Sequence, residues 1–230
     1  MKWGVNMFIK KFFILVISLI IILSFCGCSK DDGVNLGVTC QEIHTAMKYN
    51  DREIIQGRKL IDEEKIDEIK IQYNAISMKN ESILSNMNAF RMVLLVTDKN
   101  TTEKNYLDKK VRGIILVCPL SQNTRQSENT RKLFFDIVKK VNPSLNTDEK
   151  VNGVIYKVID NMASNPNSLT KIGNQSAIMG ETVFEKYKYI LRTISGLQVW
   201  IITNKDDSIK YSYDEIITIL NDVTSEIEKG

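Results

Sequence analysis

Histidine is nearly absent from this chain, since His44 is the only one in 230 residues. This scarcity excludes every metal site built from several histidines and removes most hydrolytic triads, which use histidine as a base. The surrounding segment, Glu42-Ile43-His44-Thr45, is not a zinc motif. Because His44 falls beside the apolar positions Ile43 and Met47, we expect a surface or boundary histidine rather than a general base.

Glycine-rich loops and patterned acidic loops are also missing. The glycines stand apart, and none combines with a following Lys-Ser or Lys-Thr, so no phosphate cradle is predicted. The acidic clusters lack the alternating oxygen ligands and the sharp-turn glycine of a calcium loop. We expect solvated turns at these clusters, which are residues 62–64, 67–68 and 206–207. The sequence therefore predicts no catalytic group, no metal site and no cofactor.

An excess of either charge is missing once the first 27 residues are set aside. Their removal takes away Lys2, Lys10 and Lys11 and no acidic residue, so 28 of the 31 Lys and Arg remain against 28 Asp and Glu. A neutral chain argues against nucleic acid as a partner, because phosphates favour clustered basic residues. It also argues against an electrostatic grip on anionic lipid.

The long hydrophobic run of the chain lies at its N-terminus. Lys10 and Lys11 precede the apolar residues 12–25, and Gly27-Cys28 follows them. This order resembles a bacterial lipoprotein signal peptide of type II. The resemblance implies that Cys28 receives diacylglycerol and that residues 1–27 are removed. Gly27 leaves room for the processing peptidase beside Cys28, whereas bulky Phe25 precedes the competing Cys26.

Two alternatives for this segment stay open. An uncleaved membrane helix is less favoured, because the run from Phe12 to Phe25 is shorter than the ~20 residues that span hydrocarbon. Translation starts at either Met1 or Met7, since the residues from Met7 onward already form a complete signal start. The predicted divisions are residues 1–27 as signal, residues 28–37 as lipidated cysteine and flexible spacer, and residues 38–230 as a single domain.

Hydrophobic periodicity predicts helices at several places in that domain. Thr39-x-x-Glu42 forms a capping box that starts the first helix, and a later helix ends at Asn142-Pro143. Asn146-x-x-Glu149 is expected to cap the next helix, and Ser212-x-x-Glu215 the last. The helix after Asn146 carries an apolar stripe: Val151, Val154, Ile155, Val158, Ile159 and Met162.

Strands are predicted from alternating or continuous apolar residues. They fall at residues 69–75, 90–96, 111–118, 183–194 and 197–203, with 54–61 extended. The segment 111–118 is apolar on both faces and should lie centrally. Ser195-Gly196 suits a tight hairpin turn. Strands that come in runs favour an α+β fold with an antiparallel sheet of about five strands and helices packed on it.

The order of elements resembles that of secreted and lipid-anchored Firmicute proteins of unknown function. The resemblance covers residues 39–204 and lies in the first capped helix, Asn88-Ala89-Phe90, Gly113-Ile114-Ile115, Asn142-Pro143-Ser144-Leu145 and the hairpin with Tyr189 and Gly196. It implies a fold and an extracytoplasmic address, with no activity.

Two cysteines, Cys40 and Cys118, remain after the signal and the anchor. A disulfide between them is one alternative outside the cytoplasm. Two separately buried thiols are favoured, because free cysteine is among the most buried residue types.

Aromatic residues supply the candidate recognition surface. Tyr187 and Tyr189 share one face of a strand, and Trp200 lies on the hairpin partner. Tyrosine and tryptophan are enriched at interfaces, but cross-strand pairing beneath a helix explains the same pattern. Both interpretations stay open at this stage.

These observations lead to one functional hypothesis and two alternatives. The chain is expected to be a lipoprotein of the cell envelope, anchored to the outer face of the membrane. There it acts as a non-enzymatic binding module, with the membrane and an envelope protein as partners. The alternatives are a carboxylate-dependent envelope enzyme and an inhibitor or immunity-type lipoprotein.

Overall fold

The computed structural model divides the chain into two compact units, residues 1–33 and 34–230. The structure describes parts of the second unit: residues 34–48, 52–60, 69–78, 91–98, 100–102, 104–119, 124–164, 169–172, 175–194 and 196–207.

An antiparallel sheet dominates the described residues. Its eight strands follow the order β1-β2-β3-β4-β8-β7-β6-β5, and each pair of neighbours is antiparallel. The strands are β1 Arg52–Leu60, β2 Ile69–Met78, β3 Arg91–Asp98, β4 Gly113–Pro119, β5 Leu169–Ile172, β6 Gln175–Phe184, β7 Tyr187–Ile194 and β8 Leu197–Asn204.

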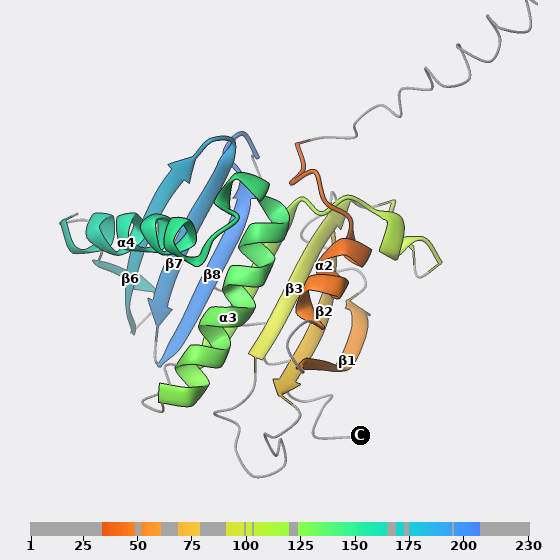
Figure 1. Ribbon diagram of the computed structural model, residues 1–230, viewed down its shortest axis with the longest axis horizontal. Helices are drawn as coiled ribbons and strands as arrows, with labels where there is room; N and C mark the ends of the chain where they lie inside the picture. The colour runs from red at the N-terminus through yellow and green to blue at the C-terminus, as the bar shows by residue number, and fades with distance from the viewer. Residues whose placement is uncertain are drawn as a thin grey trace, which may run out of the picture. The chain divides into compact units, whose positions relative to one another are not determined.

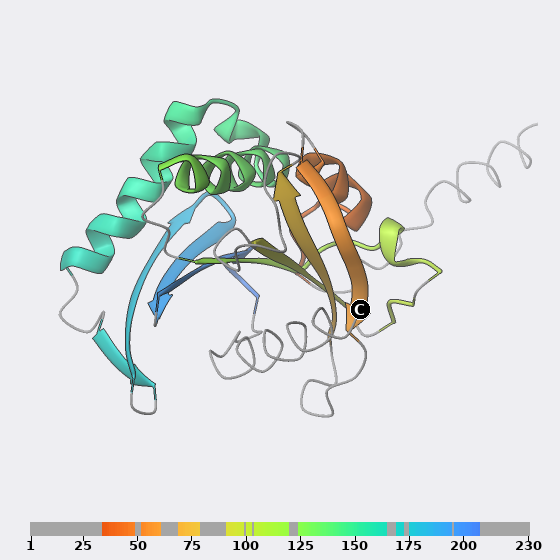
Figure 2. The same cartoon turned by 90° about the horizontal axis from the view of Figure 1, so that it is seen from below.

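Three α-helices lie on one side of this sheet (Figure 2). They are α2 Cys40–Met47, α3 Thr124–Val141 and α4 Asp148–Ser164, and the 3-10 turns η3 Tyr106–Asp108 and η4 Pro143–Leu145 join neighbouring elements. Figure 1 shows α3 crossing the middle of the sheet, with α4 over β6 and β7. The predicted α+β class with helices on an antiparallel sheet is confirmed.

The topology divides the sheet into two similar halves. A helix followed by a four-stranded meander occurs twice, as α2 with β1 to β4 and as α4 with β5 to β8. The last strands of the halves, β4 and β8, pair with each other from Gly113↔Thr203 to Pro119↔Leu197. The predicted central position of segment 111–118 is therefore confirmed.

The sheet has three strands more than the expected five. One of them, β1, falls at the segment 54–61 that was expected to be extended, and the other two arise where the sequence has no clear pattern. Predicted strand 183–194 is divided between β6 and β7 by a turn at Glu185 and Lys186, where Glu185 has a positive φ of 56°. Non-glycine residues rarely adopt this conformation, so no turn was predicted at Glu185. The short β5 at the sheet edge was likewise not predicted.

The core lies between the sheet and the helices. Alternate residues of the central strands face α3, including Val93, Leu116 and Trp200, which occupy one row across β3, β4 and β8. The other face of these strands is also buried, as Leu94, Ile115 and other residues of that face show. Burial on both faces explains why the strands read as continuous apolar runs.

The start of α4 differs from the prediction by one residue. The N–H of Lys150 donates to Thr147 Oγ1 at 3.3 Å, so Thr147 caps the helix. Asn146 instead accepts a hydrogen bond from the Lys150 ammonium, and Glu149 is exposed. Thr and Asn are both good N-cap residues, so residue type alone could not decide which of the two caps α4.

The apolar stripe of α4 is also narrower than predicted. Val151, Val154 and Val158 are buried, whereas Ile155 is half-buried and 39% of the Ile159 surface is exposed. Val154 and Val158 lie toward the sheet. Ile155 and Ile159 each follow one of these valines in the sequence, and their side chains lie at the edge of the contact between α4 and the core.

The folded unit begins earlier than the predicted boundary at residue 38. Leu36 is fully buried, and its N–H donates to the Val111 carbonyl at 2.8 Å. The Asn204 side chain donates to the Asn35 carbonyl at 3.2 Å. Residues 34–37 therefore pack into the fold, and the flexible spacer expected at 28–37 cannot extend beyond residue 33.

The predicted capping box at the start of α2 is confirmed. The Thr39 N–H donates to Glu42 Oε2 at 2.9 Å, and the Glu42 N–H donates to Thr39 Oγ1 at 3.2 Å, which completes the capping box of α2.

Cys40 and Cys118 are free and buried, so they form no disulfide with each other.

Candidate functional site

The three aromatic residues proposed as a recognition surface lie in the core. The exposed surface is 5% for Tyr187, 0% for Tyr189 and 8% for Trp200. All three face the helix layer, and the rings of Phe134 and Trp200 lie 4.7 Å apart between centroids. Alternation correctly placed the tyrosines on one face, but that face is the one that the helices cover. An exposed aromatic surface at these residues is therefore ruled out.

Trp200 nevertheless contributes to a concave site, which we call the α3–α4 groove. This groove lies between α3 and α4 above β4 and β8, and has a volume of about 340 Å³. Its apolar lining residues are Cys118, Phe134, Ile155, Ile159 and Trp200. Its polar lining residues are Ser127, Thr130, Arg131, Asn152, Tyr156 and Gln198. Volumes of roughly 300–1,000 Å³ are typical of small-molecule sites.

The apolar lining continues from the interior to solvent. Trp200 and Phe134 are buried, Ile155 is half-buried, and Ile159 is partly exposed. Tyr156, with 64% of its surface exposed, completes the lining on α4. Large apolar side chains on both the floor and the rim give the groove a surface suited to an apolar group.

The charge of the groove is positive at one wall. The Arg131 guanidinium lies 5.7 Å from the centre of the Phe135 ring, in a cation–π contact. None of the lining residues that the structure describes is Asp or Glu. The Glu128 carboxylate, on the preceding turn of α3, interacts electrostatically with Arg131 but does not line the groove. A guanidinium without a carboxylate in the same lining favours an anionic group in the groove.

A second arginine supports the same wall from inside. Arg91 is buried, and its Nε donates to Thr130 Oγ1 at 2.7 Å. This bond joins β3 to the middle of α3 and fixes the position of a lining residue. The helix wall that carries Arg131 is therefore attached to the sheet by a charge-assisted hydrogen bond.

The thiol in the groove floor is unsuited to nucleophilic chemistry. Burial raises the pKa of Cys118 to about 12, against a small opposing effect of Arg91. Its Sγ lies 3.7 Å from the Gln198 carbonyl as a weak donor. A nucleophilic cysteine needs a lowered pKa, so Cys118 contributes neutral, apolar surface.

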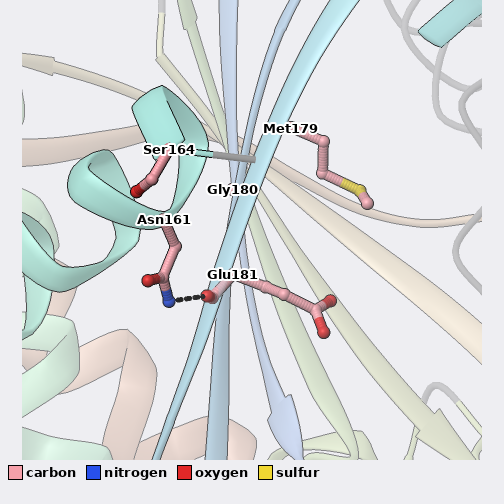
Figure 3. Close-up of a pocket in the computed structure, with 5 residues that line it drawn as sticks. All are labelled: Asn161, Ser164, Met179, Gly180 and Glu181. Carbon is pink, nitrogen blue, oxygen red and sulfur yellow. Dashed lines mark hydrogen bonds between the residues drawn. The ribbon is translucent and has the colours of Figure 1, made fainter. Parts of the chain in front are cut away.

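A second hollow lies between the C-terminal end of α4 and β6, beside the place where the helix packs on the strand (Figure 3). The Asn161 amide donates to the Glu181 carbonyl at 2.8 Å. Figure 3 shows the side chains of Met179 and Glu181 directed away from the helix, so the strand presents Gly180 and backbone to α4. This arrangement joins helix to strand but gathers no reactive groups.

The enzyme alternative needs a carboxyl group whose pKa suits acid or base catalysis. The two carboxyl groups with a shifted pKa in the described part, Glu42 and Glu128, both have it lowered. For Glu42 the main cause is the hydrogen bond from the Thr39 N–H, followed by the Lys140 ammonium; for Glu128 it is Lys132. A general acid requires a raised pKa, so these groups give the enzyme alternative no support.

His44 and Asp207, two residues considered as candidates in the sequence, contact neighbouring side chains of the fold. His44 is half-buried with its ring 6.0 Å from that of Tyr106. Asp207 was expected in a solvated turn, but its side chain is fully buried and pairs with Arg112 at 3.1 Å. Arg112 also pairs with Asp98 at 3.2 Å. The described residues contain no group of three side chains able to hold a metal ion.

Several predicted features lie outside the described residues. They are the signal segment with Cys28, the acidic clusters at 62–64 and 67–68, and the last helix that begins at Ser212. Among the helices of the described part, none has the length and apolar character to cross a membrane.

Comparison with known proteins found no matching family model, no matching curated protein and no matching solved structure. Sequence reasoning missed the α3–α4 groove because its lining comes from four elements, β4, α3, α4 and β8. The fold brings these together from a stretch of chain that runs from Cys118 to Trp200. Two large side chains of α4, Tyr156 and Ile159, are exposed at the rim of the groove, and only the packing of the helix shows this.

Proposed function

We propose that this protein is a lipoprotein of the bacterial cell envelope that acts as a binding module on the outer face of the membrane. The observation that carries the proposal is the N-terminal order of two lysines, an apolar run and Gly27-Cys28. In this proposal Cys28 carries the lipid and becomes the first residue of the mature chain.

The early start of the folded unit gives this proposal a geometric consequence. Five residues, 29–33, separate Cys28 from Val34, where the second unit begins. A fully extended chain of that length reaches about 20 Å. A lipid on Cys28 would therefore hold the domain close to the headgroups, with access to molecules at or near the membrane surface.

The α3–α4 groove supports binding as the activity. It combines an apolar floor, polar side chains and a guanidinium, as small-molecule sites do. Its thiol has a raised pKa and its described lining contains no carboxylate. These groups can hold a ligand, but they do not provide the acid, base or nucleophile that a hydrolase or isomerase needs.

Metabolic labelling with a fatty acid in a bacterial host tests the anchor. The wild-type chain and Cys26→Ala should incorporate label, whereas Cys28→Ala should not, and should keep its uncleaved signal. Cys26→Ala is the matched control because it removes a thiol two residues away. Labelling of Cys28→Ala together with loss of labelling in Cys26→Ala would move the anchor to Cys26, and absence of label from the wild type would refute lipidation.

A further inference from the structure

We infer that the α3–α4 groove binds a small monocarboxylate that has an aromatic or branched aliphatic body. This inference deepens the proposed binding function by giving the chemical class of ligand. It rests on the charge and polarity of one set of side chains, and it does not depend on the identity of the lipidated cysteine.

The apolar part of the ligand is inferred from the floor. Trp200 and Phe134 present a tilted aromatic pair, with their ring centroids 4.7 Å apart. Ile155 and Ile159 extend this surface toward solvent along α4. A flat ring or a branched alkyl group can cover both the aromatic pair and the isoleucines, and each removal of apolar surface from water favours binding.

The anionic part is inferred from the α3 wall. Arg131 supplies a planar cation whose fork of N–H donors matches the geometry of a carboxylate. The guanidinium also lies over the ring of Phe135, a neighbour on the same helix that does not line the groove. Ser127 and Asn152 add neutral groups able to donate hydrogen bonds to a carboxylate.

A single carboxylate fits this wall better than a phosphate-rich group. One guanidinium donates two parallel hydrogen bonds to one carboxylate in a planar arrangement. Nucleotide phosphates carry several charges and are commonly held by glycine-rich backbone or several cations, and the described lining has one cation. The volume of about 340 Å³ is near the lower end for ligand sites, which favours a small molecule.

Trp200 provides a direct reporter of binding. The chain has two tryptophans, Trp3 and Trp200, so Trp3→Phe leaves the indole in the groove as the single tryptophan. The full chain with this substitution is studied in detergent, and probe partition into empty micelles serves as the blank. Three probes are titrated: 3-phenylpropanoate, its neutral amide 3-phenylpropanamide, and propanoate, which lacks the ring.

The expected result is a saturable change in Trp200 fluorescence with 3-phenylpropanoate. The amide should bind about fivefold more weakly or worse, as expected for losing an ion pair worth about 1 kcal/mol at a solvent-accessible site. Propanoate should produce no saturable change at the same concentrations, because it cannot cover the apolar floor.

Two charge-neutral variants of α3 make the test specific. Arg131→Gln should reduce carboxylate affinity to that of the amide, while amide affinity stays the same. Lys132→Gln is the matched control, since it removes one positive charge from the next position of the same helix and Lys132 does not line the groove. Ile159→Ser, at the partly exposed rim, should weaken both aromatic probes equally.

Other outcomes overturn the inference. No saturable signal with any probe, equal affinity for acid and amide, or equal effects of Arg131→Gln and Lys132→Gln would each do so. Fatty-acid labelling distinguishes this failure from failure of the anchor. A labelled protein without probe binding leaves the lipoprotein proposal intact, and probe binding without label leaves the groove assignment intact.

Discussion

Replacing Gly180 with alanine tests the contact that joins α4 to the sheet. A Cβ at this position would lie 2.3 Å from the Val158 carbonyl oxygen and 2.7 Å from Met162 Cβ. Carbon atoms in good contact are about 3.5–4.0 Å apart, so helix and strand must separate by about 1 Å. This movement would also stretch the 2.8 Å hydrogen bond from Asn161 to the Glu181 carbonyl.

Such overpacking typically costs about 1–3 kcal/mol, and the upper end applies here because the carbonyl oxygen in the way belongs to backbone. For a domain of this size, about 3 kcal/mol lowers the melting temperature by roughly 6–12 °C. Thermal and denaturant unfolding of the purified variant measure this loss.

Gly153→Ala is the internal control because it makes the same chemical change on α4. A Cβ there meets nothing within 4 Å, and the position is exposed. Alanine should stabilise the helix by about 0.5–1 kcal/mol. The two substitutions should therefore have opposite signs. A Gly180→Ala protein that melts like the wild type, or equal destabilisation by both, would refute the close contact between α4 and β6.

Three further predictions concern burial and charge. Leu36→Ala should destabilise the protein by about 2–5 kcal/mol, as measured by denaturant unfolding, because its side chain is fully buried; a surface-like change would show that the fold begins later. Arg112→Met should cost about 3–5 kcal/mol, because it leaves the buried Asp207 carboxylate without this cation, and a neutral result would contradict that. Cys40 and Cys118 should resist thiol reagents at pH 8 in the native state and react after denaturation, as followed by site-resolved mass spectrometry. Burial raises the pKa of both thiols from 9.0 to about 12. As pH rises from about 9 to 12, the thiols therefore ionise in the unfolded chain before they ionise in the folded one, and the free energy of unfolding should fall. Replacing both cysteines should make the free energy of unfolding less dependent on pH over this range.

Local patterns in the sequence were sufficient for features that depend on a few neighbouring residues. The Thr39 and Glu42 capping box, the helix end at Asn142 and the hairpin with Gly196 at a φ of 82° are set by hydrogen bonding and backbone conformation within one turn. The α4 cap shows the limit of such signals. Asn146 and Thr147 have similar capping ability, and the observed choice follows from where η4 ends.

Features that depend on packing could not be predicted in the same way. Alternation places Tyr187 and Tyr189 on one face, but only the position of α3 and α4 decides that this face is buried. The α3–α4 groove depends on the side-by-side placement of strands β4 and β8, which no local pattern encodes. Arg131 gave no signal by itself, because its place in the groove lining depends on how α3 and α4 pack on the sheet.

The pairing of β4 with β8 affects how readily an incomplete chain aggregates. Each is the final strand of its half, and each is apolar on both faces. A chain released after β4 would display that strand as an unprotected edge, a known template for aggregation. The second half covers this edge only after about 80 more residues have been made, since β8 begins at Leu197. We therefore expect a fragment ending at residue 120 to self-associate, because β8 is not present to pair with β4.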